Sequence, residues 1–561
     1  MANFGYLVFV QFMGKLKVQF VSFLMAVFFA VVLPSPVQAQ KKQSYTHDDS
    51  LKGVYSLERA WWDVLHYDLH VAFNPTDSSI KGYNKINYKI LAAAKPMQID
   101  LMTPMVIDSI VQAGKKCGFR KDGDAYFVSC AAEQTVGRLQ NLSVWFHGKP
   151  KVAANPPWDG GIVWARDNNG NPWISLACQG MSSRVWFPNK DHMADEPDSA
   201  DMYFECPAGL VAVSNGRVKG MTLGNNTFIF HWQVKNPINN YNIIPYIGKY
   251  VSLKDTIVGL KGVLDLEYWV LNSNYLKAEK HFTQVKSMLH CFEYWFGPYP
   301  FYEDSYKLVE APYLGMEHQS GVAYGNNYMN GYRGRDLSLT GWGLKWDFII
   351  VHESGHEWFG NNISARDVAD NWIHESFTAY SENLYVEWLY GKKAGAEYVI
   401  GTRKSVLNDK PMIGDYNVNR DGSGDVYYKG ANLLHTIRCM VNNDSLWRET
   451  LTGLNTKFWH KTVTTAEIEN YIASKTGLSL AKVFDQYLRA SNLPVMEYRI
   501  KKGKLEYHWT SCVKGFNMPL QIITDGGVVE IKPEEKWKKI KIAGNQIKVD
   551  DNYFVLSRQI N

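Results

Sequence analysis

The chain has 561 residues, of which 46% are hydrophobic and 20% are charged, so it is long enough for several globular domains. Its formal net charge is only +5, and no long run of like charges occurs, which gives no basis for binding nucleic acid or an anionic membrane surface. The 7 cysteines are too few for a disulfide scaffold, and packing explains the 19 tryptophans and 33 tyrosines better than sugar binding does.

The segment 1–39 has the pattern of a secretory signal peptide. Lys15 precedes an apolar run from Val18 to Leu33, and the small-residue end at Ala39 is typical of a cleavage site. We therefore expect cleavage before Gln40, export to the periplasm or the extracellular space, and no transmembrane span in the mature chain. An uncleaved membrane anchor is the alternative, and synthesis could also begin at Met13.

The segment 45–254 is predicted to be a large antiparallel β domain. Hydrophobic and polar residues alternate along Tyr67–Phe73 and in later runs, and turn-forming residues separate these runs. Cys117 and Cys130 flank a predicted hairpin at 121–124. They are the best candidates for a disulfide, and the odd number of cysteines leaves at least one thiol free.

From 255 to 493 the hydrophobic periodicity becomes helical, which predicts a mostly helical domain. Thr464 and Glu467 form a predicted capping box, and Gly477 marks a predicted helix end. Short alternating segments from 494 to 561 predict a small β-sandwich. The expected fold class is therefore multidomain α+β.

The helical region contains the pattern of a catalytic zinc site. His352 and His356 are four residues apart, so on a helix they project from one face, with Glu353 beside them. Glu375 follows on a second predicted helix, off an apolar stripe that runs from Ile373 to Trp388. Two histidines and one carboxylate leave a fourth zinc position open, as catalytic sites do. The simpler alternative is a set of ordinary packed and solvated residues.

These features resemble the gluzincin aminopeptidases of peptidase family M1, the group of aminopeptidase N and leukotriene hydrolase. Residues 314–318, Leu-Gly-Met-Glu-His, resemble the family's GxMEN motif, and residues 427–430, Tyr-Tyr-Lys-Gly, resemble its YxKG motif. Weaker similarity runs from about Tyr67 to Tyr498, without the large carboxy-terminal helical domain of many relatives. The resemblance implies an exported, bacterial-type member with an amino-terminal β domain, a thermolysin-like catalytic domain and one zinc ion.

The resemblance also implies roles for individual residues. It makes His352, His356 and Glu375 the zinc ligands, Glu353 the general base, and Tyr427 a donor to the negatively charged oxygen of the transition state. Zinc lowers the pKa of its bound water from about 15.7 to about 7, so hydroxide is accessible at neutral pH. One donor to the developing negative charge is worth on the order of 3 kcal/mol.

A second set of residues is expected to bind substrate. Glu317, with Gly315 and Met316 beside it, would hold the free amino group through a charge-assisted hydrogen bond worth roughly 1.5 to 3 kcal/mol. Gln179 lies in a segment that resembles a loop reaching the active site of the family. Met181 stands where many members carry a glutamate that also holds the amino group.

Several positions depart from the family pattern. His318 and Leu314 replace residues of the GxMEN motif, and His374 and Ser376 flank the third ligand where relatives usually carry asparagine and glycine. The sequence thus predicts a zinc aminopeptidase acting on peptides. The alternatives are a related zinc hydrolase such as an endopeptidase, and a non-catalytic binding protein that kept the fold. The preferred first residue and the oligomeric state are not predicted.

Overall fold

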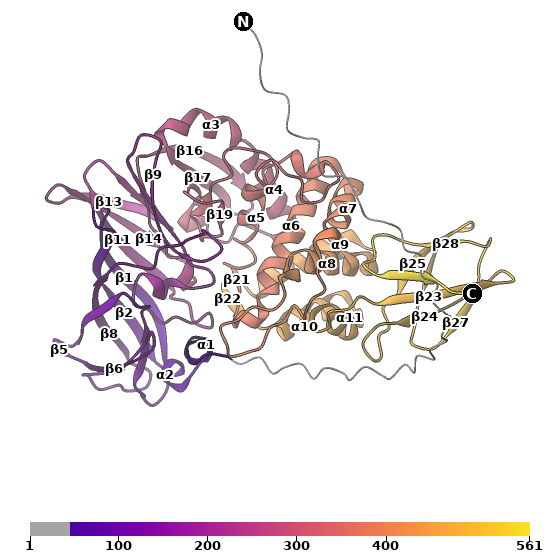
Figure 1. Ribbon diagram of the computed structural model, residues 1–561, viewed down its shortest axis with the longest axis horizontal. Coiled ribbons are helices and arrows are strands. Elements are labelled where there is room, and N and C mark those ends of the chain that lie inside the picture. The colour runs from indigo at the N-terminus through magenta and orange to yellow at the C-terminus, as the bar shows by residue number, and fades with distance from the viewer. Residues whose placement is uncertain (1–44) are drawn as a thin grey trace, which may run out of the picture. The chain divides into compact units, whose positions relative to one another are not determined.

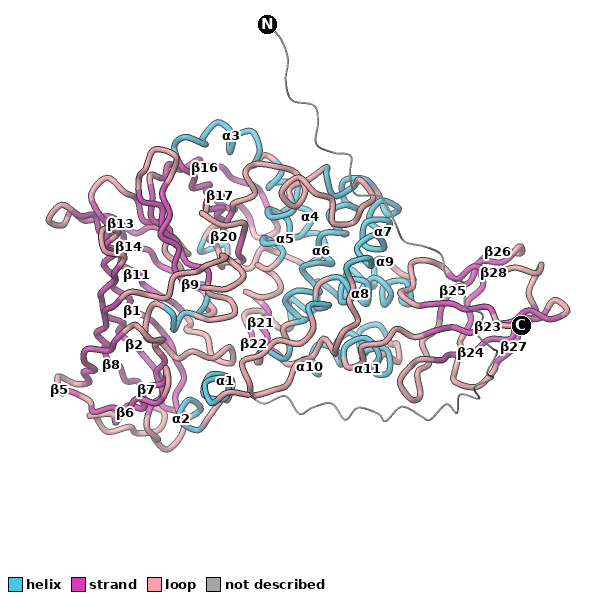
Figure 2. The backbone as a smooth tube through the Cα atoms, in the orientation of Figure 1, coloured by secondary structure: helices cyan, strands magenta, loops and turns pink. Residues whose placement is uncertain are grey.

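A computed structural model describes residues 45–561, and the expected signal peptide, 1–39, lies outside the described residues. Within the described part, strands fill the amino-terminal region, helices follow, and strands return near the carboxyl end (Figures 1 and 2). This multidomain α+β arrangement confirms the fold class predicted from the sequence. None of the described helices combines the length and the apolar character needed to cross a bilayer.

The amino-terminal region is built on an eight-stranded sheet in the order β13-β14-β11-β1-β2-β8-β4-β5. The sequence predicted an antiparallel sheet. Strand β1 does pair antiparallel with β2, but it pairs parallel with β11, so the sheet is mixed. The alternation predicted for Tyr67–Phe73 falls within β1. The strands are β1 (Trp62–Asn74), β2 (Ser79–Ile90), β4 (Val106–Gln112), β5 (Lys115–Lys116), β8 (Leu139–Gly148), β11 (Ser199–Pro207), β13 (Arg217–Leu223) and β14 (Thr227–Val234).

Two smaller sheets and two short helices complete this region. One sheet has the order β12-β15-β10-β9 and the other β3-β7-β6. The hairpin predicted at 121–124 joins β6 to β7. The elements are α1 (His47–Gly53), α2 (Leu57–Ala60), β3 (Met97–Asp100), β6 (Gly118–Asp122), β7 (Ala125–Ser129), β9 (Gly161–Arg166), β10 (Pro172–Ala177), β12 (Val211–Val213) and β15 (Tyr246–Gly248).

All seven cysteines lie in the described part of the chain, and none forms a disulfide. Cys117 and Cys130 do flank the β6–β7 hairpin, whose last backbone pair is Gly118 with Ser129. The N–H of Cys117, however, donates to the carbonyl of Ile110 at 2.8 Å, which ties this residue to β4. The disulfide predicted between the two is therefore wrong for this structure.

A five-stranded sheet, β16-β17-β18-β20-β19, begins the next region of the chain. The boundary expected at 254/255 falls inside β16, which pairs with β17 along its whole length. Within the segment 306–318, the chain forms two short strands, β18 and β19, separated by residues 311–314. The strands are β16 (Tyr250–Gly259), β17 (Gly262–Leu271), β18 (Tyr306–Glu310), β19 (Gly315–Met316) and β20 (Val322–Tyr324).

Helix α6 is buried on every face from Trp372 to Val386, whereas the sequence predicted one apolar stripe; Trp388, assigned to that stripe, is 44% exposed. The predicted capping box of Thr464 and Glu467 and the left-handed Gly477 are confirmed at the two ends of α10. The helices are α3 (Tyr275–His281), α4 (Gln284–Phe296), α5 (Phe348–Gly355), α6 (Trp372–Tyr390), α7 (Lys392–Gly401), α8 (Tyr428–Val441), α9 (Asp444–Lys457), α10 (Thr465–Thr476) and α11 (Ala481–Leu488), with a strand pair β21 (Ile363–Ala365) and β22 (Lys461–Val463).

The carboxy-terminal strands form two sheets, β27-β24-β23-β29 and β26-β25-β28, as expected for a small β-sandwich. Their buried residues join the helical region in one continuous hydrophobic core, while the amino-terminal region has a second core. The strands are β23 (Val495–Lys501), β24 (Lys504–Thr510), β25 (Leu520–Thr524), β26 (Gly527–Ile531), β27 (Lys538–Lys541), β28 (Ile547–Val549) and β29 (Leu556–Gln559).

Candidate functional site

Helix α5 presents the first two candidate ligands. Asp347 caps this helix, because its carboxylate accepts hydrogen bonds from the N–H groups of Ile349 and Ile350 at 2.9 and 3.3 Å. His352 lies inside the helix and His356 is the residue that caps its carboxyl end, directly after Gly355, and their ring centroids are 5.1 Å apart. Both side chains are buried. The four-residue spacing therefore brings the two imidazoles together, as the sequence predicted.

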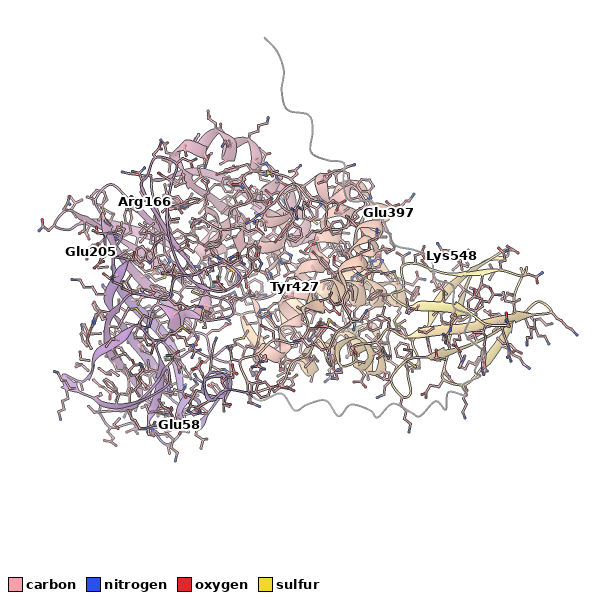
Figure 3. The ribbon with its side chains drawn as sticks, viewed as in Figure 1. Glu58, Arg166, Glu205, Glu397, Tyr427 and Lys548 are labelled. Atoms are coloured by element: carbon pink, nitrogen blue, oxygen red, sulfur yellow. The ribbon has the colours of Figure 1, made fainter. Side chains whose placement is uncertain are left out.

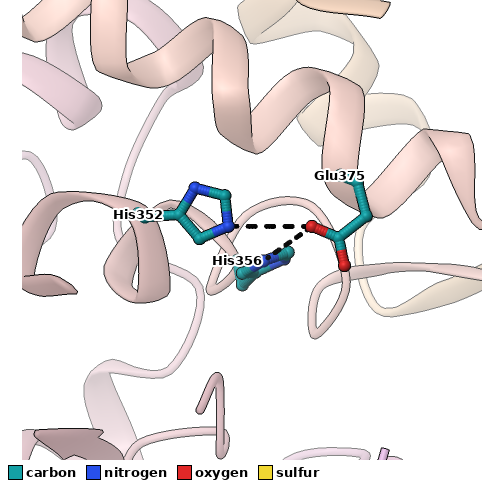
Figure 4. A group of neighbouring side chains, drawn as sticks. All are labelled: His352, His356 and Glu375. Atoms are coloured by element: carbon teal, nitrogen blue, oxygen red, sulfur yellow. Dashed lines mark ion pairs between the residues drawn. The ribbon is translucent and has the colours of Figure 1, made fainter. Parts of the chain in front are cut away.

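Helix α6 brings Glu375 to the two histidines (Figure 4). Its Oε2 lies 3.7 Å from Nε2 of His352 and 3.5 Å from Nε2 of His356. Two ligand atoms, each about 2.1 Å from a tetrahedral zinc ion, are about 3.4 Å apart, so the spacing fits this ion. The same oxygen is buried and has no hydrogen-bond partner among the described residues. A bound cation would supply the partner that such an oxygen needs.

The Nδ1 atoms of both histidines lie close to hydrogen-bond acceptors. Nδ1 of His352 lies 2.7 Å from Oε1 of Glu382, and Glu382 also accepts a hydrogen bond from Tyr398 at 2.7 Å. Nδ1 of His356 lies 3.0 Å from the carbonyl oxygen of Phe359. Each ring therefore directs its Nε2 lone pair toward the metal position.

Glu382 is a functional residue that the sequence reasoning missed. It stands seven residues after Glu375, two turns further along α6 and on the same face. This seven-residue spacing on one helix is the sequence feature that could have identified Glu382.

The charges of the site are strongly coupled. Burial raises the pKa of Glu353 to about 7, although His352 and His356 oppose the shift. Burial also disfavours the ionised form of Glu375, but His356 and His352 lower its pKa well below the usual range. The candidate ligand is thus ionised at neutral pH, while the candidate base titrates near neutrality.

Glu317, the candidate ligand for the amino group, is 2% exposed and accepts a hydrogen bond from Tyr241 at 3.0 Å. Burial raises its pKa. Gly315, two residues earlier, packs so closely on α5 that a Cβ there would lie 2.9 Å from Oε1 of Glu353. Strand β19 therefore runs beside the candidate general base, and Met316 next to it is buried.

His318 departs from the family motif. Its Nδ1 lies 2.5 Å from the hydroxyl oxygen of Tyr246 on β15. Burial lowers its pKa to about 3, so it is neutral at physiological pH. It therefore ties the segment carrying Glu317 to the amino-terminal region.

Tyr427 lies just before α8, where the helices meet the amino-terminal strands (Figure 3). Its ring stacks on that of His352 with centroids 5.9 Å apart. Burial, with an added contribution from Glu375, raises the pKa of Tyr427 well above its usual range. The phenol is therefore protonated and able to donate a hydrogen bond beside the metal position.

Gln179 reaches the site from the amino-terminal region, and its Nε2 donates to Oε1 of Glu375 at 3.3 Å. Met181 does not: its sulfur lies 3.1 Å from Nζ of Lys151, and its side chain packs against Gly160. A cavity of about 320 Å³ adjoins the site and is lined from both regions, including by Gln179 and Glu375.

Comparisons with known proteins agree with this geometry. The peptidase family M1 domain matches residues 281–487. "Probable aminopeptidase 2" of Sulfurisphaera tokodaii is 19% identical over 86% of this chain and 61% of its own length, and the leucyl aminopeptidase of Saccharolobus solfataricus is 20% identical over 83% of this chain and 59% of its own length. Aminopeptidase B of Homo sapiens is 27% identical over 39% of this chain and 31% of its own length. The chain thus spans about three fifths of the first two relatives.

Solved structures show the same fold. A mutant of an M1 zinc metallopeptidase from Deinococcus radiodurans, bound to a Tyr-Ser-Ala substrate, has a TM-score of 0.67 at 20% identity and covers 79% of this chain and 98% of its own. A mutant of a two-domain M1 zinc metallopeptidase bound to L-tryptophan has a TM-score of 0.65 at 19% identity and covers 77% of this chain and 96% of its own.

Proposed function

Because the chain belongs to peptidase family M1, we propose that it is a zinc aminopeptidase that removes amino-terminal residues from peptides. The observation that carries the proposal is the set of His352, His356 and Glu375, whose ligand atoms all lie within 4.8 Å of one another. Glu353 and Glu317 stand beside this set. The proposal includes export, which rests on the sequence of 1–39 alone.

The three ligands would hold one zinc ion, which when bound polarises the scissile carbonyl and lowers the pKa of the attacking water. Glu353 accepts the proton of that water and passes it to the leaving amine, and a pKa near 7 suits both steps. The hydroxyl of Tyr427 donates to the carbonyl oxygen as negative charge develops on it.

The carboxylate of Glu317 makes the enzyme an exopeptidase. Held by Tyr241, it pairs with the α-ammonium of the substrate and thereby places the first peptide bond beside Glu353 and Tyr427. An M1 zinc metallopeptidase of the same fold has been captured with a Tyr-Ser-Ala substrate, which supports a short peptide as the ligand here.

A Glu353→Gln variant tests the proposal. It should retain zinc at the wild-type ratio, because Glu353 is not a ligand, and lose roughly 100- to 10,000-fold in kcat, because the proton acceptor is gone. Glu449→Gln, a surface substitution at a side chain that is 57% exposed, is the matched control. Wild-type protein that carries zinc but has no chelator-sensitive turnover would contradict the proposal and support the binding-protein alternative.

One observation favours a second candidate function, an endopeptidase. Met181 stands where many relatives carry a second acid, and it packs against Lys151 and Gly160 instead of facing the amine site. Glu317 is then the one acid expected to hold the free amino group of the substrate. A substrate with a blocked amino terminus distinguishes the two functions.

A further inference from the structure

The cavity beside the zinc ligands has a wall that comes from the start of the described chain. Helix α1 is held on one side by Arg184, whose guanidinium donates two hydrogen bonds to Asp48 at 3.2 and 3.0 Å. On the other side it is held by the 415–423 loop, where Arg420 lies 3.3 Å from the carboxylate of Asp49. Helix α1 therefore bridges the amino-terminal region and the loop that leads to Tyr427.

The contact between α1 and this loop is close. A Cβ at Gly53 would lie 2.4 Å from the backbone of Val418, and the N–H of Asn419 donates to the carbonyl of Asp49 at 3.1 Å. Both α1 and the 415–423 loop line the cavity, through residues that include Lys52 and Asp421. Two segments far apart in sequence thus form one side of the site.

Lys52 gives this wall an ammonium group. Its side chain is 8% exposed, and its Nζ donates to the carbonyl of Gly180 at 3.0 Å, the one hydrogen bond recorded for it among the described residues. An ammonium has three N–H donors, so two remain for a ligand. Burial lowers the pKa of Lys52 to about 8, which leaves it protonated at neutral pH.

Asp421 supplies the opposite charge. It is exposed, it lines the same cavity, and in the part of the chain described here neither it nor Lys52 has an ion-pair partner within 4.0 Å. Although Asp421 is exposed, partial loss of its hydration raises its pKa, Glu375 adds to the shift and Lys52 opposes it, which places the carboxylate in the field of both. The cavity thus offers a free cation and a free anion that do not neutralise each other directly.

The other charged residues that line the cavity are already engaged. Asp191 lies 3.5 Å from Nε of Arg184. Asp367 accepts hydrogen bonds from the backbone N–H groups of Ala369 and Asn417 at 2.9 and 3.0 Å. Burial lowers the pKa of His192, a further lining residue, to about 4, so it is neutral.

The position of the cavity identifies its ligand if the proposed function holds. Tyr241, which holds the amine-binding Glu317, lines it, and so do Glu375 and Tyr427 next to the scissile carbonyl. The α-carbon of the first residue lies between its amino group and its carbonyl group. With the amino group at Glu317 and the carbonyl group at Tyr427, the adjoining cavity is the space that the side chain on that carbon would occupy.

We propose that Lys52 and Asp421 select peptides whose first side chain both accepts and donates hydrogen bonds, namely the carboxamide of glutamine or asparagine. Its oxygen accepts from Lys52 and its nitrogen donates to Asp421. Arginine pairs with Asp421 but is repelled by Lys52, and glutamate pairs with Lys52 but is repelled by Asp421, while leucine leaves both charged groups unpaired. This selection rests on the aminopeptidase activity proposed above.

The test measures kcat/KM for four peptides that differ only in the first residue: glutamine, arginine, glutamate and leucine. Wild-type enzyme should favour glutamine over each of the others by roughly tenfold or more. Lys52→Met should raise kcat/KM for the arginine peptide relative to the glutamine peptide by about tenfold. Asp421→Asn should raise kcat/KM for the glutamate peptide relative to the glutamine peptide by about the same factor. Lys52→Gln, which retains a donor for Gly180, replaces Lys52→Met if the latter does not fold.

Lys393→Met, at a side chain that is 91% exposed, is the control and should leave the four ratios unchanged. A merely structural role for Lys52 or Asp421 would lower all four values together, and ratios that do not move in either variant overturn the inference. Cleavage of none of the four peptides by wild-type enzyme would instead overturn the proposed function.

Discussion

The hydroxyl of Ser376 donates a 2.6 Å hydrogen bond to the backbone carbonyl of Val426. This contact joins the residue after a candidate zinc ligand, Glu375, to the residue before Tyr427. Gly430 packs over the same hydroxyl, so closely that a Cβ there would lie 1.7 Å from it. Ser376 therefore fixes Val426, and with it Tyr427, relative to the candidate metal ligands.

Ser376→Ala should lower kcat roughly ten- to a hundredfold while KM and zinc content stay close to wild type, because small displacements of an aligned group are costly. Steady-state kinetics with metal analysis checks this expectation. Ser273→Ala, at an exposed serine, is the control. An increase in KM at unchanged kcat would show that the contact serves substrate binding instead.

Glu382 should tune metal affinity through His352, to which it is bonded at 2.7 Å. Glu382→Gln is expected to weaken zinc binding about 10- to 100-fold, measured by competition with a chelator. Tyr398→Phe removes only the hydrogen bond that holds Glu382 and should give a smaller loss. Equal zinc affinity in all three proteins would contradict this role.

Glu317→Gln should lower kcat/KM for peptides with a free amino terminus by about 10- to 150-fold, since a charge-assisted hydrogen bond is lost. Tyr241→Phe keeps the carboxylate but removes its 3.0 Å hydrogen bond and should cost less. Both variants should retain zinc. A Glu317→Gln enzyme with unchanged kcat/KM would mean that the amino group is bound elsewhere.

Local patterns in the sequence were sufficient for the parts of the site that lie on one element. The spacing of His352 and His356 predicts one helix face, and the Thr464 capping box predicts the start of α10; both hold in the structure. The apolar stripe predicted for α6 was less informative, because α6 is buried on all sides and burial then no longer distinguishes its faces.

The contacts that orient the site could not be read from periodicity. Tyr241 reaches Glu317 across 76 positions of sequence, and Gln179 reaches Glu375 across 196. Lys52 enters the cavity from a helix that periodicity did not reveal. Such contacts depend on how the amino-terminal region packs against the helices, and no local spacing encodes that packing.

His435 should make stability depend on pH. It is 6% exposed, Nε2 lies 2.9 Å from Asn552, and burial lowers its pKa to about 4. Above pH 6.5, the ordinary pKa of histidine, both the folded and the unfolded state are neutral at this residue. Between 6.5 and about 4 only the unfolded state takes up the proton, so stability falls as the pH falls.

The expected slope from this residue is about 1.4 kcal/mol per pH unit. His435→Gln should therefore lose less stability than wild type between pH 6.5 and pH 5 in chemical denaturation. Parallel pH profiles for the two proteins would contradict the assignment.

The most direct test of the central claim is mass-spectrometric product analysis with one mixed peptide, supplied with a free or an acetylated amino terminus, with and without a zinc chelator. We expect stepwise removal of first residues from the free peptide only, abolished by the chelator, because Glu317 requires an ammonium group. Equal internal cleavage of both forms would contradict it.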